Sequence, residues 1–307
     1  MSPIHHQPVM VEEVVTLLAP ERGGLFADCT VGLGGHAEAL LSRGGEARLL
    51  GLDRDPQALA IAAERLRPFG ERVRLVRAKF SELGEVLRGE EIQGGILADL
   101  GVSSLQLELG ERGFSLQREG PLDMRMGGGE DISAFELVNE APEEELQKIF
   151  SEFGEERMAR RIAQTVVAAR AVETVKSTRQ LRELVYRAKG GRRKEGRIDS
   201  ATRVFQALRI AVNEELRELE RLLGEAVRLL RPDGRLVVIS YHSLEDRLVK
   251  QRLRGWADPL RDPITGRQRE EERLVELLTR KALRPSEEEI AANPRARSAR
   301  VRAARKL

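Results

Sequence analysis

D-C-T-V-G-L-G-G-H at residues 28–36, together with L-L-G-L-D at residues 49–53, sets the architecture expected of this chain. The two segments predict a strand, a glycine turn, a helix and a second strand that ends at Asp53. Parallel α/β sheets form nucleotide pockets in this way, because glycines let the backbone approach a ligand closely and a carboxylate can bind ribose hydroxyls. The sequence therefore predicts a nucleoside-bearing ligand at the ends of these two strands.

The glycine turn alone is compatible with more than one ligand. Gly32, Gly34 and Ala37 match the G-x-G-x-x-G/A pattern of dinucleotide sites. Asp53 follows at the spacing that such sites use. Asp28 precedes the turn, however, and gives D-x-T-x-G-x-G, which is close to the D-x-G-x-G-x-G of S-adenosylmethionine (SAM) enzymes. The motif favours SAM, while a dinucleotide, or a tight turn without a ligand, stays open at this point.

Basic residues are concentrated in two runs, although the total charge is small. The chain of 307 residues is 41% hydrophobic and 33% charged, with a formal net charge of +2. Residues 186–203 and 295–307 are nonetheless rich in lysine and arginine. Such runs suit a phosphate backbone, but a solvated face or a disordered tail would have the same composition.

The sequence shows no sign of a disulfide, a metal centre or a membrane segment. Cys29 is the single cysteine, which excludes an intramolecular disulfide and a thiolate zinc cluster. His5 and His6 have no partner ligands at a suitable spacing, so no metal site is predicted. We find no secretory leader and no apolar run of about 18 residues, and therefore expect a cytoplasmic protein that does not enter the membrane.

Strands and helices alternate up to about residue 104 and again after residue 200. Between these points, glycine-rich turns and helical periodicity replace the alternation. The two last strands are expected to form an antiparallel edge. The predicted helices are 56–67, 141–150, 155–171, 177–188, 202–230 and 243–254. The predicted later strands are 74–78, 94–100, 235–241, 274–279 and 298–303.

This order of elements predicts an α/β fold of the class I SAM-dependent methyltransferase type. Such a fold has a Rossmann-like, mostly parallel sheet, here with an antiparallel C-terminal strand. We expect a discontinuous SAM-binding domain at residues 1–104 and 201–307. Residues 105–200 are expected to form an inserted helical domain that recognises RNA.

D-L-G-V-S-S at residues 99–104 directly follows the fourth predicted strand. Ligands of parallel sheets bind beyond the carboxyl ends of the strands, and amino-group methylases carry here a short motif that meets the target base. Asp99 and Ser103 are therefore candidate catalytic residues. The amine of cytosine is a poor nucleophile, and a carboxylate such as Asp99 could accept its N–H bond and then its proton. Asp99 could equally bind the cofactor or cap a turn.

S-Y-H-S-L-E-D-R at residues 240–247 places an aromatic ring, a histidine and two acids after the fifth predicted strand. Tyr241 could stack on a flipped base, and His242 could form a hydrogen bond with it. The acids that follow are typical of a helix N-terminus. Phe80, after the third strand, could line an adenosine or be an ordinary core residue.

Nine segments, in order along nearly the whole chain, resemble the bacterial 16S ribosomal RNA cytosine-N4 methyltransferase family, of the MraW or RsmH type. The glycine turn alone is not specific, but the set is. The segments are H-Q-P-V-M at 6–10, D-C-T-V-G-L-G-G-H at 28–36, G-L-D-R-D-P at 51–56, D-L-G-V-S-S-L-Q-L at 99–107, R-G-F-S at 112–115, P-L-D-M-R-M at 121–126, F-Q-A-L-R-I-A-V-N at 205–213, I-S-Y-H-S-L-E-D-R at 239–247 and N-P-R-A-R-S-A-R at 293–300.

The resemblance implies SAM as methyl donor and a cytosine in the decoding region of 16S ribosomal RNA as acceptor. A helical insertion after the fourth strand is also a trait of the family. This chain has Leu33, Leu105 and Tyr241 where arginine, proline and phenylalanine are common. It lacks the Pro-Pro-aromatic motif of DNA amino-methylases, so Phe114 or Tyr241 is expected to stack on the base. By motif, the cofactor contacts are Gly34, Gly35, His36, Asp53, Phe80, Asp99 and Gln106.

We therefore expect a SAM-dependent methyltransferase that modifies N4 of a cytosine in 16S ribosomal RNA, free or in the small ribosomal subunit. Two other functions stay open: a non-catalytic RNA-binding factor of ribosome assembly, and a nicotinamide-dependent oxidoreductase. The second lacks support, because no second half-sheet of the right pattern follows. A homodimer is compatible with the sequence.

Overall fold

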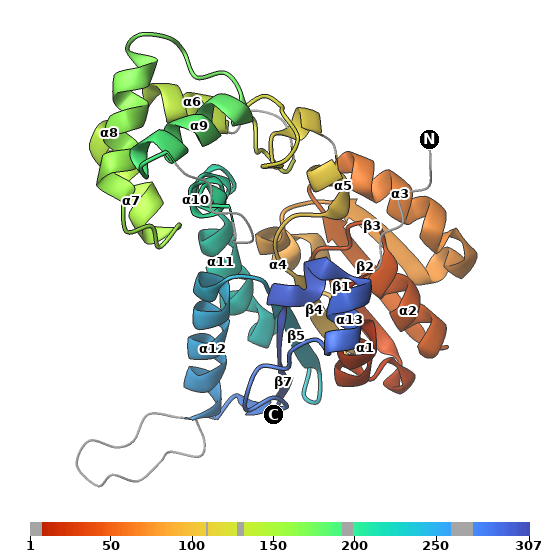
Figure 1. The fold of residues 1–307 in the computed structure, drawn as a ribbon. Helices are drawn as coiled ribbons and strands as arrows, with labels where there is room; N and C mark the ends of the chain where they lie inside the picture. Colours follow the sequence, from red (N-terminus) through yellow and green to blue (C-terminus); the bar gives the residue numbers. More distant parts are fainter. Residues whose placement is uncertain (1–7, 109, 128–131, 192–198, 259–272) are drawn as a thin grey trace, which may run out of the picture. The chain divides into compact units, whose positions relative to one another are not determined.

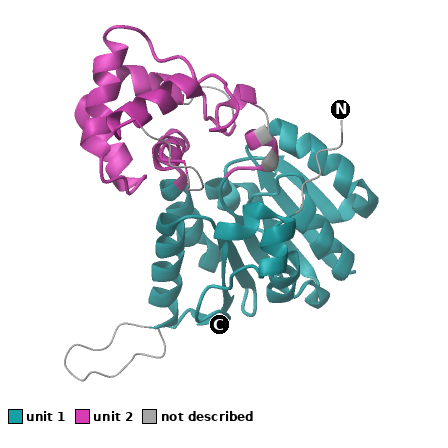
Figure 2. Ribbon diagram, in the orientation of Figure 1, with its two compact units in different colours: residues 1–101, 216–307 teal, residues 102–215 magenta. Residues whose placement is uncertain are grey.

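The computed structural model describes residues 8–108, 110–127, 132–191, 199–258 and 273–307 (Figure 1). Contacts within the chain divide it into two compact units. Unit 1 comprises Met1–Gly101 and Leu216–Leu307, and unit 2 comprises Val102–Glu215 (Figure 2). The second boundary thus follows residue 215, not residue 200 as the sequence indicated.

Unit 1 contains one sheet of seven strands, namely β1 (Gly24–Asp28), β2 (Ala47–Asp53), β3 (Val73–Arg77), β4 (Gly95–Asp99), β5 (Arg235–Ser240), β6 (Val275–Leu277) and β7 (Arg300–Lys306). Their order is β3-β2-β1-β4-β5-β7-β6. The first five strands are parallel, whereas β7 runs antiparallel to both β5 and β6. The expected class I methyltransferase fold, mostly parallel with an antiparallel C-terminal strand, is confirmed.

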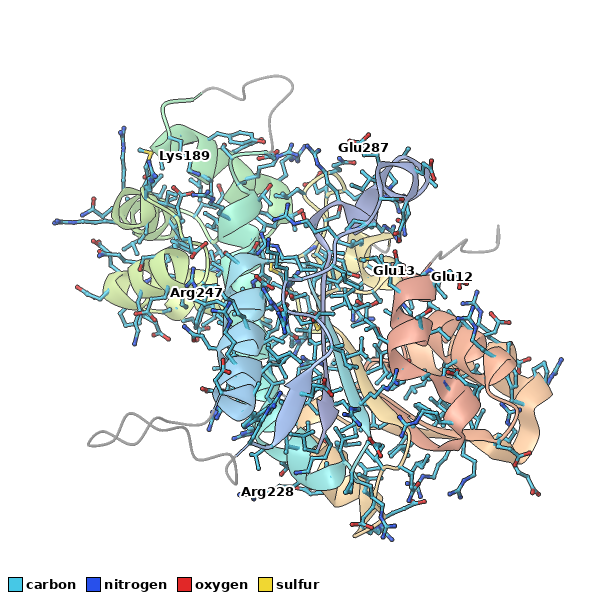
Figure 3. All side chains as sticks on the ribbon, turned by 90° about the horizontal axis from the view of Figure 1, so that it is seen from below. Glu12, Glu13, Lys189, Arg228, Arg247 and Glu287 are labelled. Atoms are coloured by element: carbon cyan, nitrogen blue, oxygen red, sulfur yellow. The ribbon has the colours of Figure 1, made fainter. Side chains whose placement is uncertain are left out.

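Helices cover both faces of this sheet. Alternate residues of a strand point to opposite faces, so Phe26 packs with α1, α2 and α3, while its neighbours Leu25 and Ala27 pack with α4, α11 and α12. Charged side chains such as Arg228 and Arg247 lie on the outside (Figure 3). The helices are α1 (Val11–Leu18), α2 (Gly35–Arg43), α3 (Pro56–Leu66), α4 (Leu83–Leu87), α11 (Glu215–Leu229), α12 (Ser243–Ala257) and α13 (Glu287–Ala292).

The final strand begins later than expected, and the long helix predicted at 202–230 is two helices. A 3₁₀ turn at Pro294–Ser298 delays the start of the strand to Arg300. The long helix is interrupted at Asn213 and Glu214, where Glu214 has a φ of 48° that helical geometry does not allow. The Asn213 side chain accepts from Met126 N and donates to Met124 O, so it bonds a neighbouring loop.

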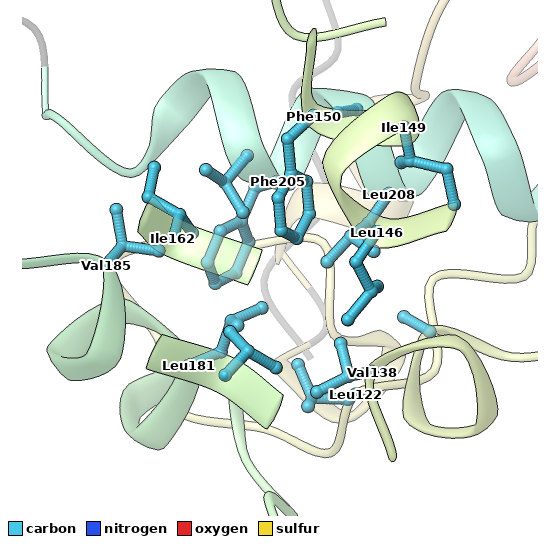
Figure 4. Close-up of a cluster of buried hydrophobic side chains, with 14 of the residues drawn as sticks. Leu122, Val138, Leu146, Ile149, Phe150, Ile162, Leu181, Val185, Phe205 and Leu208 are labelled. Atoms are coloured by element: carbon cyan, nitrogen blue, oxygen red, sulfur yellow. The ribbon is translucent and has the colours of Figure 1, made fainter. Parts of the chain in front are cut away.

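Unit 2 is a bundle of helices around its own hydrophobic core (Figure 4). Phe205 and Leu208 of α10 belong to this core, which explains why the unit extends beyond residue 200. Helix α6 was not predicted, although Ser133 and Glu136 form a capping box at its start. The helices are α5 (Ser104–Glu108), α6 (Ala134–Glu140), α7 (Glu143–Glu152), α8 (Ala159–Arg170), α9 (Thr178–Ala188) and α10 (Thr202–Val212).

Among the described residues, no helix combines the length and the apolar character that a bilayer span requires.

Candidate active site

The glycine turn after β1 adopts a backbone that only glycine forms without strain. Gly32 and Gly34 have φ values of 51° and 81°, in the left-handed region. Gly34 is the N-cap of α2. Gly35 follows with a different constraint, because a Cβ atom there would lie 2.8 Å from Cγ of Pro8. At Gly34 a Cβ atom would lie 3.4 Å from Cα of Ala62, so Gly34 packs against α3, while Gly35 packs against Pro8.

Asp53 joins the turn after β1 to the turn after β2. Its Oδ2 accepts from Gly32 N and its Oδ1 from Asp55 N, each at 2.9 Å. Asp55 in turn caps α3 by accepting from Gln57 N at 3.0 Å. Burial raises the pKa of Asp53, and the two amide bonds offset part of that rise. The carboxylate keeps further lone pairs, with which it can accept ribose hydroxyls.

Thr30 connects the ends of β1 and β4. Its amide donates to Asp28 Oδ1 at 3.1 Å, and its Oγ1 accepts from Asp99 N at 2.7 Å. Asp28 is only 2% exposed, and burial raises its pKa to about 7. A glycine at position 30 could not make the side-chain bond, so the threonine in the glycine motif has a structural function.

Asp99 is oriented from two further elements. The hydroxyl of Tyr241, which follows β5, donates to Oδ1 at 2.8 Å. Nδ1 of His36, in α2, lies 3.8 Å from Oδ2. Burial raises the pKa of Asp99, while His36 and the tyrosine bond lower it in part. We refer to Asp28, Asp53 and Asp99 as the site carboxylates.

Phe80 lies just beyond β3, in the 3₁₀ turn Phe80–Glu82. Its partly buried ring packs against the core between the sheet and α11. Ser81, the next residue, donates from its hydroxyl to Oε2 of Glu218, which is only 1% exposed. Glu218 therefore holds the turn that carries Phe80.

The sequence as a whole matches one family over its full described length. The profile of the MraW methylase family matches residues 3–307. The chain belongs to the MraW methylase family. Ribosomal RNA small subunit methyltransferase H from Symbiobacterium thermophilum is 48% identical over 313 residues, which cover 99% of this chain and 97% of that protein. The protein of the same name from Syntrophotalea carbinolica is 50% identical over 309 residues, which cover 98% of each chain.

Solved structures add a weaker likeness. An rRNA methylase from Streptococcus thermophilus has a TM-score of 0.44 and 11% identity, and the match covers 99% of each chain. The assignment to the MraW methylase family therefore comes from the sequence.

The residues at the ends of β1 to β4 fit the donor of a class I methylase, SAM. Gly32 and Gly34 form a left-handed turn that a side chain would strain, the Asp53 carboxylate would accept the ribose hydroxyls, and the Phe80 ring would line the adenine. When bound, SAM supplies a methyl group that its sulfonium already activates.

His36 is buried and contacts the chain at Val9, just before α1. It is 6% exposed, and its Nε2 lies 2.8 Å from the carbonyl oxygen of Val9. Its other ring nitrogen faces Asp99, so the structure gives it two protein neighbours. As a proposed cofactor contact, His36 would act mainly by holding Asp99 and Val9.

Ser103 and Gln106 belong to unit 2 and bond each other. Ser103 N donates to Gln106 Oε1 at 3.0 Å, and Gln106 N donates to Ser103 Oγ at 3.3 Å. This is the reciprocal pattern of a capping box at the start of α5. Gln106 is 3% exposed. The other predicted site residues belong to unit 1.

His242 is the N-cap of α12. Its Nδ1 accepts from Glu245 N at 3.4 Å, and its Nε2 lies 3.1 Å from Oε1 of the same glutamate. Glu245 is 2% exposed and accepts from the amides of Tyr241 and His242. The expected helix N-terminus is present, and both imidazole nitrogens face Glu245.

One expectation for a contact with the base was wrong, and one for RNA binding stays a prediction. Phe114 is 8% exposed and packs in the core of unit 2, so its ring does not present a face for stacking. The basic C-terminal run is largely strand β7, where Arg300 and Arg302 pair with Asp246 and Arg305 pairs with Glu276. These three arginines have carboxylate partners within unit 1, and RNA binding by the run stays a prediction.

Two other expectations fall on parts outside the described residues. Residues 192–198 of the basic run at 186–203 lie there. His5 and His6 also lie outside.

The sequence pointed to the site carboxylates at strand ends but missed their supports. Thr30 was read only as a substitute for glycine, and Glu218 was not singled out. A sequence pattern could have identified the Ser103–Gln106 capping box, because it is local. None could have identified Glu218, which lies 137 residues from its partner.

Proposed function

We propose that this protein transfers the methyl group of SAM to N4 of a cytosine in the decoding region of 16S ribosomal RNA. The observation that carries the proposal is the carboxylate of Asp99, held at the end of β4 by Tyr241 beside the glycine turn. Membership of a methylase family, and relatives named ribosomal RNA small subunit methyltransferase H, support the substrate class.

Asp99 is suited to accept the proton of an exocyclic amine. Burial raises its pKa above that of an ordinary carboxylate, which makes the ionised form a better base. The amine nitrogen would form its bond to the methyl carbon as the carbon–sulfur bond breaks, and the N–H proton would pass to the carboxylate. Because the methyl group is already activated, positioning of the amine supplies most of the remaining rate.

We propose that Ser103 and His242 contact the cytosine. Ser103 follows β4 and would contact the base from the D-L-G-V-S-S segment. His242 follows β5, and its ring orientation is held by Glu245. Each of these two side chains also takes part in a helix cap.

We further propose that unit 2 binds the RNA. Arg157, Arg160 and Arg161, around the start of α8, are exposed and close together in sequence. Exposed arginines of this kind can neutralise phosphates and release their counterions. The substrate, free RNA or the small ribosomal subunit, would then be held by a unit separate from the one that holds SAM.

The test is mass spectrometry of nucleosides from small ribosomal subunits that lack the modification. Subunits are incubated with the protein and SAM labelled in its methyl group, and the RNA is digested. We expect labelled N4-methylcytidine from one site. Label on another atom or on another RNA would contradict the proposed specificity, and no label despite bound SAM would favour a non-catalytic assembly factor.

A further inference from the structure

The hydroxyl of Tyr241 and the carboxylate of Asp99 connect the ends of two neighbouring strands. β4 and β5 are paired in register up to Asp99 and Ile239. Tyr241 lies just after β5 and donates to Asp99 Oδ1 at 2.8 Å. The backbone of Asp99 is fixed separately, because its amide donates to Thr30 Oγ1 at 2.7 Å. The main chain and the side chain of Asp99 are thus held by different residues.

Tyr241 is itself held at its backbone and its ring. Its amide donates to Glu245 Oε2 at 2.8 Å. Its partly buried ring packs against the core that contains Leu97 and Ile239. A Cβ atom on Gly101 would lie 3.6 Å from the ring, in ordinary contact. The hydroxyl therefore reaches Asp99 from a ring whose position is already fixed.

We propose that Tyr241 is a positioning residue for methyl transfer, whose hydroxyl orients the Asp99 carboxylate toward the cytosine amine. The proposal rests on the proposed function and adds the group that aims its base. A carboxylate has about four acceptor positions, so the tyrosine bond occupies one and leaves others for the amine. An oriented acceptor matters here because the reacting groups must be placed closely before the methyl group moves.

The surrounding charges keep the tyrosine a donor and Asp99 its acceptor. Burial raises the pKa of Tyr241 well above its usual value, and Asp99 and Glu245 raise it further, so the hydroxyl stays protonated. Glu289 of α13 acts in the same direction. The groups that face Asp99 are His36, Tyr241, Glu245 and, from β1, Asp28.

Two substitutions at Tyr241 distinguish the contribution of the hydroxyl from that of the ring. Tyr241→Phe removes the hydrogen bond and keeps the aromatic ring, whereas Tyr241→Leu removes both. If the ring acts by stacking on the base, the phenylalanine variant should behave like the parent. If the hydroxyl positions Asp99, Tyr241→Phe should already show most of the loss in methyl-transfer rate that Tyr241→Leu shows.

The first measurement follows the Asp99 carboxyl directly, in the protein without RNA. Carboxyl carbons of aspartate are labelled with ¹³C, and the Asp99 signal is assigned with Asp99→Asn. Loss of the tyrosine donor should move the titration of Asp99 to higher pH in Tyr241→Phe, because that bond lowers its pKa. An unchanged titration would overturn the proposal.

The second measurement is the pH profile of methyl transfer at saturating SAM and RNA. The base must be ionised, so the rate falls as the pH drops through the pKa of Asp99, and this limb should lie at higher pH in Tyr241→Phe. We expect kcat to fall about tenfold on the plateau, with KM for SAM nearly unchanged. Equal kcat and an unmoved profile, even with a shifted titration, would overturn the role in methyl transfer.

The two measurements also separate this proposal from the proposed function. If the parent protein methylates no cytosine of small-subunit RNA, the proposed function fails, and the positioning role fails with it. The carboxyl titration still decides in that case whether Tyr241 controls Asp99. If the parent is active and Tyr241→Phe behaves as the parent, the function stands and the positioning role alone is wrong.

Discussion

Buried carboxylates occur in both units, but their partners differ. In unit 2, Glu156 lies 2.5 Å from Lys189 Nζ, and Glu215 forms a bidentate pair with Arg209 at 2.7 and 2.8 Å. In unit 1, the site carboxylates are held by backbone amides, a tyrosine hydroxyl and a histidine. The first arrangement compensates a buried charge with an opposite charge, and the second does so only in part.

The difference separates groups that stabilise the fold from groups available for chemistry. Arg302 and Arg300 offset the burial of Asp246 and lower its pKa, so this carboxylate stays ionised and structural. Burial instead raises the pKa of each site carboxylate. Incompletely compensated carboxylates cost stability, and they are typical of binding and catalytic sites.

The largest effect is expected when the proposed base, Asp99, is removed and its surroundings are kept. Asp99→Asn keeps the shape of the side chain and an oxygen that can accept from Tyr241, but it cannot take the amine proton at neutral pH. We expect kcat at saturating SAM to fall about a thousandfold, the scale of a lost general base. Rapid-quench assays with small ribosomal subunits measure it. A loss below about threefold, in a variant with the parent's melting temperature, would exclude Asp99 as the proton acceptor.

Removing the partner of a buried carboxylate in unit 2 should instead lower the stability of the fold. Lys189→Met leaves Glu156 buried without its cation, since the glutamate side chain is 5% exposed. The free energy of unfolding should fall by about 3 kcal/mol. Urea denaturation, with hydrogen exchange of α8 and α9, measures it. The control is the double variant with Glu156→Gln, which should recover part of the loss, while SAM affinity stays unchanged in both.

Removing the charge of Asp28 should stabilise the protein at alkaline pH. The folded-state pKa is about 7, against 3.8 in the unfolded chain, so the native state binds more protons and loses stability as the pH rises between these values. From pH 5 to pH 8 this cost grows by about 2 to 3 kcal/mol. Denaturation of Asp28→Asn at both pH values should show a decline smaller by that amount. Equal declines in the two proteins would show that Asp28 is not held with a raised pKa.

The smallest effect concerns the support of Phe80. Ser81→Ala removes the hydroxyl that donates to Glu218, so the turn that carries the ring loses one anchor. We expect the dissociation constant for SAM to rise about fivefold, which corresponds to about 1 kcal/mol, the scale of one ordinary hydrogen bond. Calorimetry measures it. Ser151→Ala, in an exposed position of unit 2, is the matched control, and equal affinity of both variants would remove Glu218 from the site.

The sequence predicted those parts of the candidate site that depend on residues close together in the chain. The glycine turn and Asp53 were predicted because strand ends and turns are local patterns, and the sheet places those ends side by side. The supports depend on long-range contacts: Thr30 bonds the amide of Asp99, which lies 69 residues away. The break at Asn213 was missed for the same reason, because its side chain bonds a loop far back in the sequence.

SAM binding at the ends of β1 and β2 is the central claim, and a calorimetric titration tests it directly. SAM is titrated into the parent protein, into Asp53→Asn and into Glu287→Gln, whose exposed carboxylate lies on α13. We predict one binding site in the parent and in Glu287→Gln, with affinity at least tenfold weaker in Asp53→Asn, where one acceptor of the ribose site is lost. No heat of binding in the parent, or equal affinity in all three proteins, would contradict the account.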